Sequence, residues 1–88
     1  MNPKSNLNEQ NRCDLILLDF PPNQFIRLIH VIMSFERGFK VSLSEARDLT
    51  QNLPSIVAKG LPLVEITKLR DAYQEIAKAE VEICPSEN

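Results

Sequence analysis

Aromatic side chains and basic charge are both scarce in this sequence. It has no Trp, four Phe and one Tyr, and its 10 Lys and Arg are outnumbered by 12 Asp and Glu, for a formal net charge of -2. Proteins dedicated to nucleic acid usually present a basic patch, and single-strand binders stack bases on aromatic rings. We therefore expect no nucleic-acid partner.

Long apolar runs are also absent. The longest uninterrupted one, Leu15 to Leu18, is far shorter than the ~20 residues that a transmembrane helix needs. Residues 1–10 are polar and lack the apolar core of a signal peptide. These features predict a soluble, cytoplasmic protein with no membrane partner.

Metal-ligand spacing is missing as well. The two cysteines, Cys13 and Cys84, lie far apart in the sequence, and His30 is the only histidine. Without a Cys-x-x-Cys pair or a His cluster, no metal site or other cofactor is expected. The cysteines are interpreted as reduced thiols, with a redox or disulfide role as the alternative.

The composition is that of one ordinary globular domain. Hydrophobic residues make up 43% and charged residues 25% of the 88 positions. Polar residues 1–11 are predicted to form a flexible N-terminal tail, residues 12–84 the domain, and residues 85–88 a C-terminal tail.

Apolar periodicity and breaker residues predict six elements within the domain. A two-layer α+β sandwich follows, in which three helices cover one side of a three-stranded antiparallel sheet. The order is β-α-α-β-α-β: strand 12–20, helix 25–36, a helix within 41–54, strand 55–60, helix 62–78 and strand 79–84.

Several element boundaries are marked by single residues. Ser42 and Glu45 have the spacing of a capping box, and Pro54 ends the helix that they begin. Asn23 is predicted as the N-cap of the preceding helix, and Gly60 as the end of the second strand.

The helix at 25–36 is unusually apolar. Arg27, His30 and Ser34 form one narrow polar stripe, because they are spaced by three and four residues. The apolar residues divide into two stripes, whereas a helix on one sheet needs only one. The second stripe, Ile26, Ile29 and Met33, must therefore pack either on another helix of the domain or on a partner.

Four segments, in order, resemble the C-terminal domain of the bacterial ribosomal stalk protein. Leu43-Ser-Glu-Ala-Arg-Asp-Leu49 is similar to its signature Leu-Lys-Glu-Ala-Lys-Asp-Leu, and Cys13-Asp-Leu-Ile-Leu17 to its first strand, Phe-Asp-Val-Ile-Leu. The resemblance covers about residues 12–84. Its other segments are 53–60, similar to the second strand and the following turn, and 69–83, similar to the last helix and strand.

The resemblance implies a recruiting domain that is not an enzyme. In the family, the first two helices bind translation factors, and the first carries Val-Ile-Lys-x-Val-Arg, similar to Leu28-Ile-His-Val-Ile-Met33. The matching contact residues are Ile29, His30, Met33 and Arg47, to which the second apolar stripe adds Ile26. The expected partner is a translation factor or another helical protein surface.

Three departures from the family pattern stand out. His30 and Met33 replace a Lys and an Arg, which removes positive charge that would meet an acidic factor. The turn before the second helix, Arg37-Gly-Phe-Lys-Val41, is longer than the family's glycine-rich turn. The stalk protein also has an N-terminal dimerisation domain, whereas only about eleven residues precede this domain, so a monomer is expected.

Other functions are open from the sequence. Leu18-Asp-Phe-Pro-Pro-Asn-Gln-Phe25 is similar to the strand-to-helix turn of the Clp protease adaptor, which recognises N-terminal residues of substrates, although only Asp19 remains of its acidic cluster. An accessory subunit of a larger complex is a further alternative. Glu80 and Glu82 alternate outward on a strand, which is typical of a solvated edge rather than of catalytic carboxylates.

Overall fold

The computed structural model describes residues 12–34 and 41–86. The predicted tail at residues 1–11, the end of the first helix at residues 35–36 and the connection at residues 37–40 lie outside the described residues.

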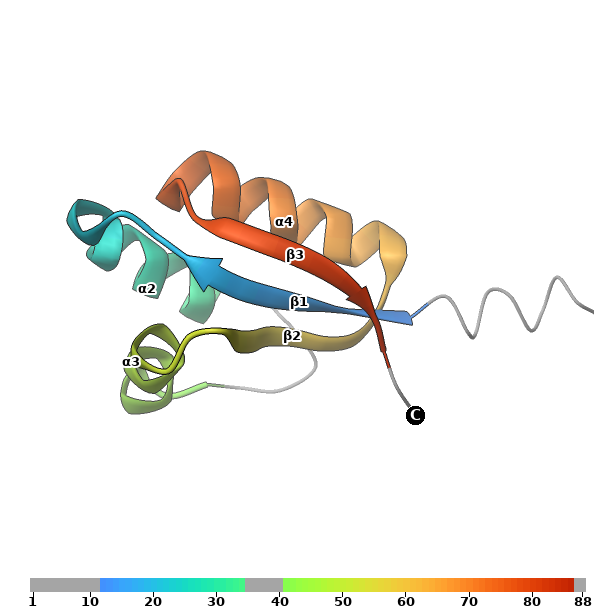
Figure 1. Ribbon diagram of the computed structural model, residues 1–88, viewed down its shortest axis with the longest axis horizontal. Coiled ribbons are helices and arrows are strands. Elements are labelled where there is room, and N and C mark those ends of the chain that lie inside the picture. The colour runs from blue at the N-terminus through green and yellow to red at the C-terminus, as the bar shows by residue number, and fades with distance from the viewer. Residues whose placement is uncertain (1–11, 35–40, 87–88) are drawn as a thin grey trace, which may run out of the picture.

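The predicted α+β class and the order β-α-α-β-α-β are confirmed (Figure 1). One additional 3-10 turn, η1, precedes the first α-helix. The elements are β1 (Arg12–Asp19), η1 (Pro22–Gln24), α2 (Phe25–Ser34), α3 (Leu43–Gln51), β2 (Ser55–Pro62), α4 (Leu63–Ala77) and β3 (Glu80–Pro85).

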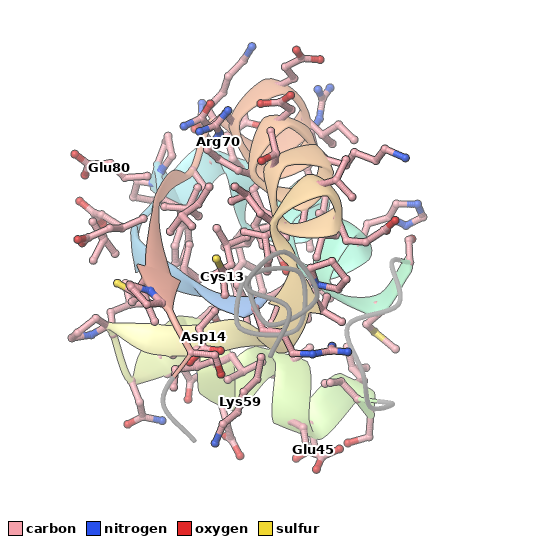
Figure 2. All side chains as sticks on the ribbon, turned by 90° about the vertical axis from the view of Figure 1, so that its right-hand side faces the viewer. Cys13, Asp14, Glu45, Lys59, Arg70 and Glu80 are labelled. Atoms are coloured by element: carbon pink, nitrogen blue, oxygen red, sulfur yellow. The ribbon has the colours of Figure 1, made fainter. Side chains whose placement is uncertain are left out.

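The three strands form an antiparallel sheet in the order β2-β1-β3, so the first strand is central. Helix α4 contacts all three strands, α2 packs against α4, and α3 packs against α2 and β2. Seen along the long axis, the strands lie toward one side of the molecule and α4 toward the other (Figure 2). This arrangement leaves the opposite face of the sheet without a described helix.

The core lies between the sheet and the helices. Leu15 and Leu17 of the central strand are fully buried, as alternation on a strand with one covered face requires. Tyr73 is the largest fully buried side chain. The buried hydrophobic residues are Cys13, Leu15, Leu17, Leu28, Ile29, Val31, Ile32, Ala46, Val57, Ala58, Ile66, Leu69, Tyr73, Ala77 and Ala79.

The prediction that Asn23 caps the first helix is wrong. Pro21 has extended backbone and precedes the turn Pro22–Gln24, which runs directly into α2 at Phe25. The N–H of Gln24 donates to the carbonyl oxygen of Pro21 at 2.9 Å. Because proline fixes the φ angle needed for a first helical turn, the Pro-Pro pair begins the turn before Asn23 is reached.

The capping box at the start of α3 is confirmed. The Ser42 hydroxyl accepts from the N–H of Glu45 at 3.2 Å, and the Ser42 N–H donates to the Glu45 carboxylate at 2.9 Å. These two bonds satisfy amide groups that a helix leaves without partners in its first turn. The reciprocal pair therefore anchors the start of α3.

The second strand does not end at Gly60, as predicted, but continues to Pro62. Gly60 has a φ of +68°, and the β1–β2 register shifts between Cys13 and Leu15, so the strand bulges there rather than ending. The Asp14 carboxylate, on a residue only 8% exposed, accepts from the Gly60 N–H at 2.8 Å. Arg12 donates to the Gly60 carbonyl oxygen at 2.8 Å, so the bulge is held from both sides.

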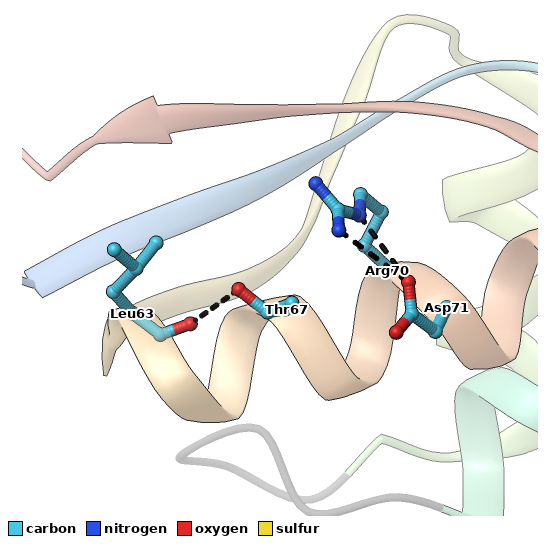
Figure 3. Close-up of polar contacts among 4 residues, drawn as sticks. All are labelled: Leu63, Thr67, Arg70 and Asp71. Carbon is cyan, nitrogen blue, oxygen red and sulfur yellow. Dashed lines mark hydrogen bonds and ion pairs between the residues drawn. The ribbon is translucent and has the colours of Figure 1, made fainter.

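The long helix α4 (Leu63–Ala77) buries one face in the core and exposes the other to solvent. Ile66, Leu69 and Tyr73 are buried, whereas Ile76 at the margin of that face is 40% exposed. On the polar side, the Thr67 hydroxyl donates to the Leu63 carbonyl oxygen at 2.9 Å (Figure 3). Arg70 Nε lies 3.4 Å from Asp71 Oδ1 and forms an ion pair with it. Pro62 is the N-cap rather than part of the first turn, and strand β3 begins at residue 80 rather than 79.

Candidate protein-docking surface

Helix α2 buries four of its ten residues, Leu28, Ile29, Val31 and Ile32. Leu28, Val31 and Ile32 are fully covered, because α2 packs against both α4 and α3. This packing accounts for most of the apolar character that the sequence shows. The outer face of α2 is formed by its exposed residues, Ile26, Arg27, His30, Met33 and Ser34.

The second apolar stripe is split by this packing. Ile29 is only 9% exposed and belongs to the core, whereas Ile26 is 76% exposed and Met33 is 46% exposed. Ile29 therefore offers little surface to a partner, and for this residue the structure shows packing within the domain. Ile26 and Met33 are left as the apolar part of the outer face.

His30 lies between these two side chains. Ile26, His30 and Met33 are spaced by four and three residues, so their side chains follow one row along α2. Arg27 and Ser34 are exposed beside this row, in agreement with the predicted polar stripe. The outer face of α2 is therefore apolar along one border and polar along the other.

Arg47 lies on the neighbouring helix, α3, and is exposed. Among the described residues the ion pair formed is Arg70 with Asp71, so Arg47 is not paired with a described carboxylate. It lines a shallow surface hollow along α3. The lining residues are Leu43, Ser44, Arg47, Asp48 and Gln51.

Leu43 is a candidate that sequence reasoning missed. It belongs to the apolar face of α3 together with Ala46, yet it is 53% exposed while Ala46 is fully buried. Leu43 is the first residue of the helix, and more than half of its surface is exposed there. Its spacing of four from Arg47 places an apolar and a basic side chain side by side on the surface.

The electrostatics of α3 are set mainly by its capping box. The hydrogen bond from the Ser42 backbone N–H, with a smaller contribution from the Ser42 side chain, lowers the pKa of Glu45 below 4.5. Glu45 is therefore a carboxylate at neutral pH, at the positive end of the helix dipole. Its role is to hold the helix that carries Arg47 in place.

Surface hollows elsewhere include one between two turns at the end of the sheet. It lies where β1 leads into η1 and where α4 leads into β3. Asp19 and Glu80 are neighbours in the β1–β3 register, so two carboxylates approach it. The lining residues are Asp19, Phe20, Pro21, Pro22, Lys78, Ala79 and Glu80.

The two cysteines are free thiols. Cys13 is buried, and Cys84 lies opposite Asp14 in the register of β1 and β3. Partial burial, followed by the charges of Glu82 and Asp14, raises the pKa of the Cys84 thiol above 9.0. A raised pKa means little thiolate near neutral pH, which disfavours nucleophilic or metal-binding chemistry at Cys84.

Within residues 12–34 and 41–86, no three side chains of His, Cys, Asp or Glu gather closely enough to hold a metal ion. None of the helices in this part of the chain has both the length and the apolar character needed to cross a bilayer. Comparison of the chain with models of known protein families, and with curated proteins, finds no match. The resemblance to the ribosomal stalk domain therefore stays a prediction from the sequence segments alone.

Proposed function

We propose that this domain is a non-enzymatic protein-interaction module that binds a translation factor or another helical protein surface through α2 and α3. The observation that carries the proposal is the exposure of Ile26 and Met33 on a helix whose other aliphatic side chains are buried. When a partner covers apolar side chains this exposed, their burial stabilises the complex. A few apolar anchors of this kind dominate the binding energy of many interfaces.

The chemistry of the surface indicates the kind of partner. His30 and Met33 stand where the similar family carries positive charge, so Arg27 and Arg47 are the basic groups left on these helices. The partner we expect presents an apolar groove with a modest acidic border. Loss of two cationic positions lowers the electrostatic contribution to binding and favours a less acidic partner than the family's.

The proposal is tested by titrating purified elongation factors into the protein and measuring heat by calorimetry. Replacing both anchors, Ile26→Asp with Met33→Asp, should weaken binding by roughly tenfold or more, since an interface anchor is worth more than ~1 kcal/mol. The double variant should stay folded with a modest fall in Tm, because Ile26 is 76% exposed and Met33 is 46% exposed.

Val64→Asp is the matched control. Val64 is a 62% exposed aliphatic residue on the first turn of α4, at the end of the molecule away from the start of α2 (Figure 1). It should leave affinity unchanged. Absence of binding to any elongation factor would refute that choice of partner, and equal losses in both variants would refute the surface.

A second candidate function is substrate recognition of the Clp-adaptor type. The observation that favours it is the hollow between the two turns, where Asp19 and Glu80 would attract the cationic α-amino group of a substrate. Peptides with a free or an acetylated N-terminus, and with different first residues, distinguish the two candidates. A preference for the free amine that Asp19→Asn removes would support the adaptor function, whereas the stalk-like function predicts no preference.

A further inference from the structure

Strand β3 is an edge of the sheet and pairs with β1 along one side only. Among the described residues, no strand pairs with its other side. An edge strand directs half of its backbone N–H and C=O groups outward, where an extended segment can pair with them. The strand Glu80–Pro85 is therefore a backbone template that no strand of the described residues fills.

The side chains of β3 alternate in a way that selects the added strand. Glu80 and Glu82 are exposed on the outer face of the sheet, whereas Val81 and Ile83 are half-buried on the helix side. In the turned view, Glu80 projects away from the body of the molecule (Figure 2). Neither glutamate takes part in an ion pair with a cationic side chain of the described part.

A fourth strand would place its own side chains directly beside these residues. Opposite charges on neighbouring strands stabilise the pairing, and like charges destabilise it. The outward residues of the added strand should therefore be Lys or Arg, beside Glu80 and Glu82. Its inward residues should be aliphatic, because they would complete the partial cover of Val81 and Ile83.

The same pattern disfavours a second copy of this chain as the occupant. Pairing β3 with another β3 would bring the glutamates of the two copies together, which is unfavourable. The other edge strand, β2, is a less regular template, because its register with β1 shifts twice, whereas that of β3 shifts once. We propose that the free edge of β3 accepts an extended segment of another protein with alternating basic and aliphatic residues.

The proposal is tested with a fluorescein-labelled peptide of alternating Lys and Val, using fluorescence anisotropy. Glu80→Gln with Glu82→Gln should weaken binding roughly two- to thirtyfold, from two cross-strand charge pairs. Glu80→Lys with Glu82→Lys should abolish binding of this peptide and create binding of a peptide that carries Glu in place of Lys. Exposed Glu65 and Glu75 of α4 provide the control, since reversing both gives the same net charge without touching β3.

A second measurement separates strand addition from simple charge attraction. A peptide methylated at alternate backbone nitrogens keeps its charges but loses strand hydrogen bonds, so it should not bind. Equal binding of the methylated peptide, a failure of charge reversal to switch the preferred peptide, or an equal loss in the α4 control would each overturn the proposal. A concentration-dependent dimer that the Lys peptide does not dissociate would assign the edge to a second copy and overturn it too.

The outcome is independent of the docking surface on α2 and α3. Ile26→Asp with Met33→Asp should bind the Lys peptide as the wild type does. Each proposal can therefore fail while the other holds.

Discussion

Two isoleucines three residues apart on α2 should lose very different amounts of stability on truncation to alanine. Ile29 is 9% exposed within the core, whereas Ile26 is 76% exposed. Replacing a buried isoleucine by alanine costs about 2–5 kcal/mol, because transfer energy is lost and a cavity remains. A domain of 88 residues has a free energy of unfolding of roughly 4–13 kcal/mol, so Ile29→Ala removes a large fraction of it.

The cost of Ile26→Ala follows from the small part of that side chain that is covered. Full burial of an isoleucine is worth about 1.5–3 kcal/mol, and only about a quarter of Ile26 is covered, which leaves ~0.5 kcal/mol. In a domain of this size, 1 kcal/mol shifts the Tm by roughly 4–8 °C. Ile26→Ala should thus lower the Tm by about 2–4 °C, and Ile29→Ala by at least ~8 °C.

Urea denaturation followed by circular dichroism measures both free energies, with the Tm as a second readout. Equal slopes of unfolding free energy against urea concentration for the two variants would show that the substitutions change stability and not the compactness of the unfolded chain. If both variants lose a similar amount of unfolding free energy, whether small or large, the rotation of α2 about its axis is not as described. The division of its apolar stripe into core and docking residues would then be wrong.

Three further predictions concern the supporting structure. The lowered pKa of Glu45 stabilises the fold above pH 4.5, so the advantage of wild type over Glu45→Gln in urea denaturation should vanish as the pH falls through the folded-state pKa. Gly60→Ala should lower the unfolding free energy by about 1–2 kcal/mol in the same assay, because a φ of +68° is unfavourable for a residue with a Cβ. Steric overlap adds nothing to this cost, since the atom nearest to an added Cβ, Ser86 Oγ, is 3.9 Å away. Cys84 should be alkylated by iodoacetamide at mildly alkaline pH more slowly than in the unfolded chain, and Glu82→Gln should accelerate it.

Local signals predicted the elements well where the stabilising contact is itself local. The capping box joins residues three apart, and both of its hydrogen bonds are formed as the spacing indicates. The continuation of β2 through Gly60 was not predicted, because the carboxylate that holds the bulge belongs to Asp14, 46 residues earlier. Nothing in the local sequence indicates that Asp14 is buried. Its burial follows from the pairing of β1 with β2, which brings its carboxylate to the Gly60 N–H.

The candidate docking surface was predicted only in part, for a geometric reason. Spacing along α2 assigns residues to rows but does not say how wide an arc the rest of the domain covers. Contacts with both α4 and α3 extend that arc to Ile29 and stop short of Ile26 and Met33. Leu43 was missed because its position on the apolar face of α3 suggests burial. At this first residue of the helix the side chain is 53% exposed, whereas Ala46 on the same face is fully buried.

The two proposed surfaces differ in the force that would drive binding. Ile26 and Met33 would supply mainly apolar contact at the proposed surface, so binding there should change little with salt. Glu80 and Glu82 are exposed, so attraction at the β3 edge is screened once ionic strength rises and the Debye length falls below ~10 Å. A partner whose affinity is nearly independent of salt is therefore assigned to α2 and α3, and one whose affinity falls roughly two- to thirtyfold with salt is assigned to the sheet edge. Salt dependence, measured before any mutation is made, indicates which surface a newly found partner uses.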